Sequence, residues 1–196
     1  MLLVIDVSGS MGDPGDNRGA TKLALAKQAA IDALGQFKAD AHVGLRIFST
    51  EISRAPPTDY VDVVPIGPIS AQREQLATRI RSLTPTNGTP LYTVTGDSFT
   101  AMQDAYDPAR INAVVLLSDG RNEDRRNNNL DQLLSTLRAG SEGQGTRPVR
   151  VFPIAYGKDA NLAVLRRIAE ATNAAAYDAG DPTTINQVLT AVISNF

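Results

Sequence analysis

The sequence predicts a single α/β domain built on a mostly parallel sheet. Strand-like apolar runs alternate with helix-like segments along the chain, which is the pattern of repeated βαβ units. Residues 2–5 and 113–117 are entirely apolar, as strands buried on both faces are. We therefore expect a doubly wound, Rossmann-like sheet of about six strands, with right-handed crossovers that place helices on both of its faces.

The strands are predicted from short apolar or alternating runs. Their expected ranges are 2–7, 42–49, 60–66, 111–117, 149–156 and, as a short last strand, 175–177. The two most continuously apolar strands, the first and the fourth, belong at the centre of the sheet. The pair Pro56-Pro57 marks a turn, and so short a connection holds no crossover helix. The strand over 60–66 is therefore expected to be antiparallel and to lie at an edge.

The helices are predicted from apolar positions that recur at helical spacing after a capping residue or a proline. Their expected ranges are 22–37, 71–83, 91–106, 130–138, 160–172 and 182–194. Thr21 and Ser70 are the expected N-caps of the first two helices, and Pro90 starts the third. The segment 12–19 is rich in glycine and aspartate and is expected to be a loop.

Oxygen-bearing side chains follow both central strands. Asp6, Ser8 and Ser10 alternate where the first strand ends, and Asp119 follows the fourth. If these strands are neighbours, their carboxyl ends form the switch point of the sheet, where α/β proteins bind ligands. Thr89 stands at the opening of a predicted helix. Carboxylate and hydroxyl oxygens are the donors that Mg²⁺, Mn²⁺ and Ca²⁺ prefer.

Each of these residues also has an ordinary structural explanation. Ser8-Gly9-Ser10 is typical of a turn after a strand, and Asp119-Gly120 is a common turn dipeptide. Thr89 before Pro90 is typical of a helix N-cap. Three separate loops with short oxygen donors nevertheless favour a shared site over three unrelated turns.

The three motifs together resemble the von Willebrand factor type A domain. They are Asp6-x-Ser8-x-Ser10, Thr89 within Gly88-Thr89-Pro90-Leu91, and Asp119 within Leu117-Ser118-Asp119-Gly120, and the resemblance covers essentially the whole chain. It implies one such domain over 1–196, of bacterial type and taken from a longer protein.

The resemblance also implies a metal-ion-dependent adhesion site. Ser8, Ser10 and Thr89 would contact a divalent cation, with Asp6 and Asp119 acting directly or through water. Mg²⁺ is the expected ion, with Mn²⁺ and Ca²⁺ as alternatives. The implied function is a non-enzymatic adhesion module, in which the metal accepts an Asp or Glu carboxylate of a protein partner. A regulatory or scaffold module of a larger bacterial machine, chelatase-like or solute-binding-like, remains an alternative.

Enzymatic alternatives fit the sequence less well. A haloacid-dehalogenase-like phosphotransferase would need an aspartate as acid and base where Ser8 stands, and no lysine is expected at the right place after a helix-initiating loop. A serine hydrolase is disfavoured because Ser10 lacks the Gly-x-Ser-x-Gly frame. The one histidine, His42, begins a strand whose start lies at the opposite edge of the sheet, about 20 Å away.

The composition of the chain argues against several other kinds of site and function. The chain has no cysteine and one histidine, which excludes thiolate and multi-histidine zinc sites. A net charge of −2 gives no indication of nucleic-acid binding, and no apolar run approaches the ~20 residues of a membrane span. Asp13 and Asp16 are expected in a solvated loop rather than at a second ion. Arg121, Arg125 and Arg126 are expected in an exposed mixed-charge loop at the rim of the site.

We further expect a monomer, and by analogy with the family an extracellular or cell-envelope location.

Overall fold

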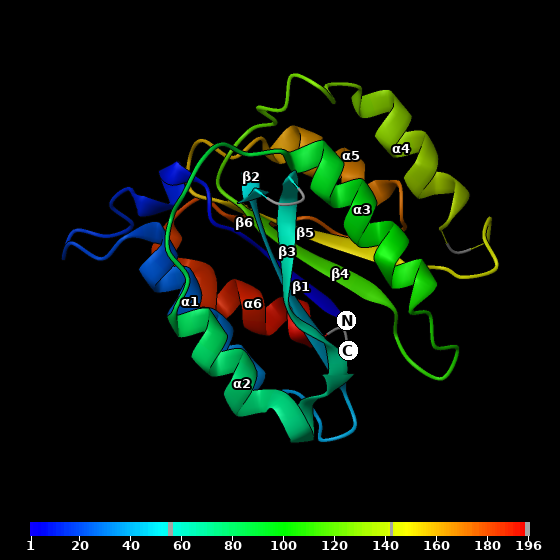
Figure 1. Ribbon diagram of the computed structural model, residues 1–196, viewed down its shortest axis with the longest axis horizontal. Helices are drawn as coiled ribbons and strands as arrows, with labels where there is room; N and C mark the ends of the chain where they lie inside the picture. Colours follow the sequence, from blue (N-terminus) through cyan, green and yellow to red (C-terminus); the bar gives the residue numbers. More distant parts are fainter. Residues whose placement is uncertain (55–56, 142, 195–196) are drawn as a thin grey trace.

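The computed structural model describes residues 1–54, 57–141 and 143–194, and these form one sheet covered by helices on both faces (Figure 1). The sheet has six strands in the order β3-β2-β1-β4-β5-β6. The strands are β1 (Leu2–Asp6), β2 (His42–Arg54), β3 (Pro57–Pro68), β4 (Ala113–Ser118), β5 (Arg150–Tyr156) and β6 (Tyr177–Ala179). Among the strands of the described residues, only β3 runs antiparallel to its neighbour, at the edge beyond β2. The predicted doubly wound fold with one antiparallel edge strand is confirmed.

The helices divide between the two faces of the sheet. α1 (Lys22–Leu34), α2 (Ile69–Arg81) and α6 (Ile185–Ile193) pack together on one face, and α3 (Leu91–Asp104), α4 (Leu130–Ala139) and α5 (Leu162–Glu170) cover the other (Figure 1). Short 3₁₀ turns, η1 (Gly9–Gly12) and η2 (Pro182–Thr184), precede α1 and α6. Among the described residues, no helix has the length and apolar character needed to cross a bilayer.

β1 lies at the centre because both of its faces are apolar. Leu3 and Ile5 face the core under α1, α2 and α6, while Leu2 and Val4 face the core under α3, α4 and α5. β1 pairs in parallel with both β2 and β4. Truncating Ile5, which is 1% exposed, to alanine would cost about 2–5 kcal/mol. This placement brings the carboxyl ends of β1 and β4 side by side, as the sequence predicts.

The capping residues in the sequence predict the start of α1 correctly but not the start of α2. Thr21 is the predicted cap of α1, and its hydroxyl accepts a hydrogen bond from the Ala24 amide at 3.1 Å. Ser70 is not a cap, because α2 begins one residue earlier, at Ile69. The Ile69 side chain is fully buried and its amide donates to the Ala41 carbonyl at 2.8 Å. Tertiary anchoring of Ile69 therefore sets the start of this helix.

The strands β2 and β3 are longer than predicted. They continue as an antiparallel arm beyond the parallel part of the sheet, with a register shift between Phe48 and Ser53. Glu51 adopts a positive φ of 49° within this irregular stretch. β6 begins at Tyr177 rather than at residue 175. Of the predicted turn at Pro56-Pro57, Pro56 lies outside the described residues and Pro57 opens β3.

Candidate metal centre

Asp6 and Asp119 lie at the adjacent carboxyl ends of β1 and β4. Asp6 is the last residue of β1, and its carboxyl group is fully buried. Its Oδ1 accepts the Ser8 amide at 2.7 Å, and its Oδ2 accepts the Ser118 hydroxyl at 2.6 Å. The Asp6 carboxyl is therefore held in one orientation by a bond from each strand end.

The hydroxyls of Ser8 and Ser10 converge on Asp119. The 3₁₀ turn that follows Ser8 places the two Oγ atoms 3.2 Å apart. Both donate to Oδ1 of the fully buried Asp119, Ser10 at 2.8 Å and Ser8 at a longer 3.5 Å. The buried Met11 side chain anchors this turn in the core. The structure thus brings together four of the five predicted site residues through direct hydrogen bonds.

Thr89, the fifth predicted residue, lies against the loop that carries Asp119. It is 2% exposed, and a Cβ added to Gly120 would lie only 2.8 Å from Thr89 Oγ1. Thr89 is not a helix cap, since α3 begins after Pro90 without a side-chain cap bond. The structural explanation of Thr89 as an N-cap is therefore wrong, and its hydroxyl lies against Gly120, the residue after Asp119.

Glu123 fixes the backbone of Thr89. The Thr89 amide donates to Glu123 Oε2 at 3.0 Å, and the Glu123 amide donates to the Thr89 carbonyl at 2.8 Å. A Cβ on Gly88 would lie 2.7 Å from the same Glu123 oxygen. Glycine at 88 therefore allows the loop before α3 to approach the loop after β4 closely.

Lys22 also reaches this site, and the sequence reasoning missed it. Lys22 is the first residue of α1, its side chain is 8% exposed, and its Nζ donates to Asp119 Oδ2 at 2.8 Å. We expected no lysine at this position relative to the strand ends, and that expectation is wrong. The available signal was topological: the helix after β1 must begin at the carboxyl edge of the sheet. The argument against a phosphotransferase now rests on Ser8 alone.

Burial raises the pKa of Asp6 to about 7. The hydrogen bonds from Ser118 and Ser8 favour the ionised carboxylate, whereas the negative charge of Asp119 opposes it. Asp6 and Asp119 are both fully buried and lie close together. Two such carboxyl groups ionise together readily only when a cation lies next to them.

The model of the von Willebrand factor type A domain matches residues 1–191 of this sequence. The chain belongs to this family. No curated protein matches it significantly.

Solved structures agree with the type A fold. A von Willebrand factor type A protein from Catenulispora acidiphila superposes with a TM-score of 0.77 at 20% identity, over 98% of this chain and 41% of that one. Proximal thread matrix protein 1 from the mussel byssus, with a zinc-occupied MIDAS motif, has a TM-score of 0.70 at 18% identity over 98% and 46%. The manganese-loaded TRAP protein of Plasmodium vivax has a TM-score of 0.63 at 16% identity over 96% and 72%. This type A domain spans less than half of the first two chains.

The donors of the type A site fit a divalent cation. Three hydroxyls and two carboxylates are hard oxygen donors, the kind that divalent cations prefer. Within the described ranges, no group of three or more His, Cys, Asp and Glu side chains is disposed to hold a metal. Because the cluster offers five candidate donors, it would leave part of an octahedral ligand shell to water, which suits Mg²⁺ because this ion gives up water reluctantly.

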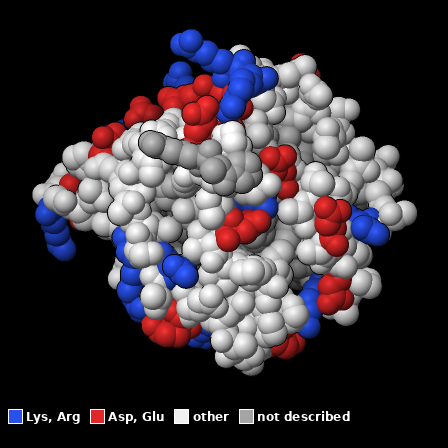
Figure 2. Space-filling model, in the orientation of Figure 1, with Lys and Arg blue, Asp and Glu red and all other residues white. Residues whose placement is uncertain are grey.

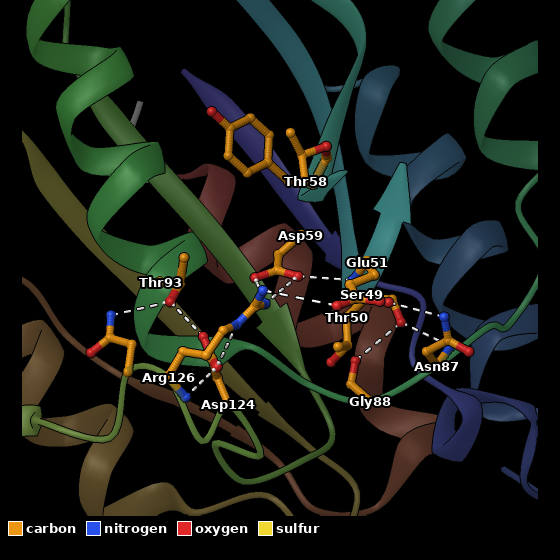
Figure 3. A network of polar contacts seen from close by, with 12 residues as sticks. Ser49, Thr50, Glu51, Thr58, Asp59, Asn87, Gly88, Thr93, Asp124 and Arg126 are labelled. Carbon is orange, nitrogen blue, oxygen red and sulfur yellow. Dashed lines mark hydrogen bonds and ion pairs between the residues drawn. The ribbon is translucent and has the colours of Figure 1, made fainter. Parts of the chain in front are cut away.

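The rim of the type A site is braced by Arg126. Its guanidinium donates to Asp59 Oδ2 on β3 at 2.9 Å and to Asp124 Oδ1 at 3.4 Å, as Figure 3 shows. Asp124 in turn accepts the Thr93 hydroxyl of α3 at 2.9 Å. Arg126 therefore lies in an exposed mixed-charge loop, as expected, with a side chain that is 61% exposed. It also links the loop 121–129 to the β2–β3 arm through Asp59, which the sequence did not predict. Arg121 and Arg125 are exposed.

In the described part of the chain, no side chain of the remaining sequence candidates is hydrogen-bonded to the side chains of the five predicted ligands. Asp13 is exposed, with its Oδ2 4.0 Å from Lys22 Nζ, and Asp16 accepts the amides of Arg18 and Ala20 within the loop. His42 begins β2, six residues before Phe48, which pairs with Asp6; the separation of about 20 Å is too large for a triad. On the face that Figure 2 shows, acidic and basic side chains of the described residues are interspersed without a broad basic patch.

Proposed function

We propose that this type A domain is a non-enzymatic module that binds a protein partner through a divalent cation. The observation that carries the proposal is the convergence of the Ser8 and Ser10 hydroxyls on Asp119, with Thr89 against the same loop. These donors lie at the carboxyl edge of the sheet, the edge at which open α/β sheets bind ligands. The zinc-occupied MIDAS motif of the mussel byssus protein and the manganese-loaded state of the Plasmodium vivax protein support the proposal of a divalent ion.

The proposed ligands are the hydroxyls of Ser8, Ser10 and Thr89, with Asp6 and Asp119 acting directly or through water. Neutral hydroxyl donors leave most of the ionic charge uncompensated, so the bound cation supplies a Lewis-acidic docking point for an external carboxylate. An Asp or Glu side chain of a partner protein matches that chemistry. Mg²⁺ is the proposed ion, and Mn²⁺ and Ca²⁺ offer related oxygen chemistry.

The same residues argue against catalysis. Ser8 stands where a phosphotransferase would need a carboxylic acid for proton transfer. His42 begins β2 at the opposite edge of the sheet from Ser10, so a serine–histidine pair is not formed. We therefore assign the cluster to binding.

A second candidate function is a regulatory or scaffold module in a larger bacterial machine. It is favoured by one observation: this chain aligns with only 41% of the Catenulispora acidiphila chain, so a similar domain there is part of a longer protein. For residues 1–196 we propose a single type A domain, monomeric and located in the cell envelope or outside the cell. Sedimentation of the purified domain tests the first two statements, and fractionation of the producing cells tests the third.

Titration calorimetry with Mn²⁺ tests the metal-binding proposal. The wild-type protein should give a saturable isotherm, and Ser10→Ala and Asp119→Asn should each weaken binding at least about tenfold, the scale of losing one charged or polar ligand. Ser70→Ala is the matched control, because Ser70 is exposed on α2 and outside the cluster. Unchanged affinity in Ser10→Ala and Asp119→Asn would overturn the assignment of the site.

A further inference from the structure

Lys22 occupies a position that a lysine rarely takes for structural reasons alone. It is the first residue of α1, where a positive charge opposes the helix dipole. Its side chain is 8% exposed, and lysine is seldom so buried unless it is paired. Neither helix stability nor burial of apolar surface therefore explains this residue. Its partner does: Nζ donates to Asp119 Oδ2 at 2.8 Å.

The fold holds the Lys22 backbone firmly in place. Its carbonyl accepts the Tyr156 hydroxyl at 2.7 Å, and its amide donates to the Asp13 carbonyl at 2.9 Å. A Cβ on Gly157 would lie 3.4 Å from the Lys22 Cε and 3.6 Å from its Nζ. These are ordinary van der Waals distances, so the end of the Lys22 side chain packs against the residue that follows β5. Lys22 is built into the site and is not a surface side chain that happens to reach it.

We propose that the Lys22 ammonium is a resident cation of the site, which neutralises Asp119 when no divalent ion is bound and keeps the affinity for the free ion low. Asp119 is fully buried, and of the two carboxylates near Nζ the other, Asp13, is 63% exposed and 4.0 Å away. An unpaired carboxylate at the position of Asp119 would strongly destabilise the fold. With Lys22 in place, the metal-free domain is expected to stay folded.

The affinity half of this inference rests on the proposed function. The ammonium of Lys22 places a positive charge directly against Asp119. That charge repels a divalent ion bound beside it and attracts an anionic ligand from outside. Lys22 would thereby make tight metal binding depend on the partner carboxylate.

Thermal unfolding in EDTA tests the first half of the proposal without any metal. Lys22→Met should lower Tm by roughly 10 °C, the scale of breaking a buried ion pair in a domain of this size. Lys27→Met is the matched control on the same helix, because Lys27 Nζ donates at 3.0 Å to the Leu83 carbonyl and not to a carboxylate. Adding Asp119→Asn to Lys22→Met should recover most of the loss. An equal Tm for Lys22→Met and Lys27→Met, or no recovery of Tm in the double variant, would overturn the proposal that Lys22 neutralises Asp119.

Calorimetry with Mn²⁺ tests the second half. Lys22→Met should bind Mn²⁺ roughly tenfold more tightly than wild type, since one unit of like charge is removed, whereas Lys27→Met and Lys22→Arg should bind as wild type does. Weaker binding by Lys22→Met would overturn the inference and make Lys22 an organiser of the ligands. If no protein binds Mn²⁺, the proposed function and the affinity half fail together, while the EDTA result still decides the role of Lys22 toward Asp119. If Lys22→Met does not fold, the EDTA comparison passes to two other variants. Lys22→Arg should keep the wild-type Tm, and the double variant Lys22→Met with Asp119→Asn should fold with a Tm close to it.

Discussion

Ser118 Oγ donates a 2.6 Å hydrogen bond to Asp6 Oδ2 and so joins the last residues of the two central strands, β4 and β1. Both side chains are fully buried. The bond orients the Asp6 carboxyl group before any ligand arrives, which lowers the cost of assembling a binding site. The candidate metal centre is therefore preorganised by the pairing of the sheet itself.

Ser118→Ala tests this relationship. The substitution leaves one Asp6 oxygen without its partner, and we expect the free energy of unfolding in EDTA to fall by about 1–3 kcal/mol. Urea titration measures the change. Ser70→Ala, at an exposed position of α2, should stay within ~0.5 kcal/mol of wild type. An equally small effect of Ser118→Ala would contradict the proposed orientation of Asp6.

Gly120→Ala should disturb Thr89 directly. The new Cβ would lie 2.8 Å from Thr89 Oγ1, closer than a methyl group and an oxygen tolerate. We expect weaker Mn²⁺ binding in calorimetry. Gly96→Ala, within α3, is the matched control. Its new Cβ would lie at an ordinary contact distance of 3.5 Å from Leu133 Cδ1 of α4. That control should bind metal normally and gain about 0.5–1 kcal/mol of stability. Normal metal binding by Gly120→Ala would place Thr89 outside the site.

Arg126→Ala should loosen the loop that positions Thr89. Arg126 joins Asp124 in this loop to Asp59 on β3, and the Glu123 amide beside them donates to the Thr89 carbonyl. Hydrogen exchange in the segment 121–129 should therefore accelerate, read by mass spectrometry. Arg125→Ala, at an exposed neighbouring position, should exchange as wild type does. Identical exchange in the two variants would show that the link through Arg126 is not needed.

The pKa of Asp124 gives a pH dependence with a defined sign. Burial acts to raise this pKa, but the bonds from the Arg126 amide, the Thr93 hydroxyl and the Arg126 guanidinium outweigh burial and lower it. A lowered folded-state pKa contributes stability that is present above the unfolded-state pKa and is lost as the pH falls through the folded-state value. The stability difference between wild type and Asp124→Asn should thus shrink from pH 6 to below about pH 4. Urea titrations at several pH values measure it, and a constant difference would contradict this role.

The sequence predicts the fold class and the positions of the candidate ligands because both follow from local patterns. Uninterrupted apolar runs identified β1 and β4 as central, and the polar residues after them mark the edge of the sheet. The convergence of Ser8 and Ser10 on Asp119 follows once β1 and β4 are neighbours. The role of these residues as metal ligands remains a prediction.

The features that the sequence did not predict depend on contacts between distant segments. In the sequence, Lys22 looks like an ordinary helix residue. Only the fold brings the start of α1 to the end of β4 and so pairs Lys22 with Asp119, which is 97 residues away along the chain. Similarly, the sequence predicts the exposed loop that holds Arg126 but not the ion pair of Arg126 with Asp59, which the β2–β3 arm brings close to it. Charge pairing across loops has no periodic signature in the sequence.

A crystal structure of the domain with Mn²⁺, with an anomalous difference map to locate the ion, tests the central claim most directly. We expect one anomalous peak within coordination distance of Ser8 Oγ, Ser10 Oγ and Thr89 Oγ1, and a water, buffer anion or neighbouring carboxylate at the position left open. A peak elsewhere on the molecule, or none at these hydroxyls at saturating Mn²⁺, would contradict the account of this domain as a metal-dependent binding module.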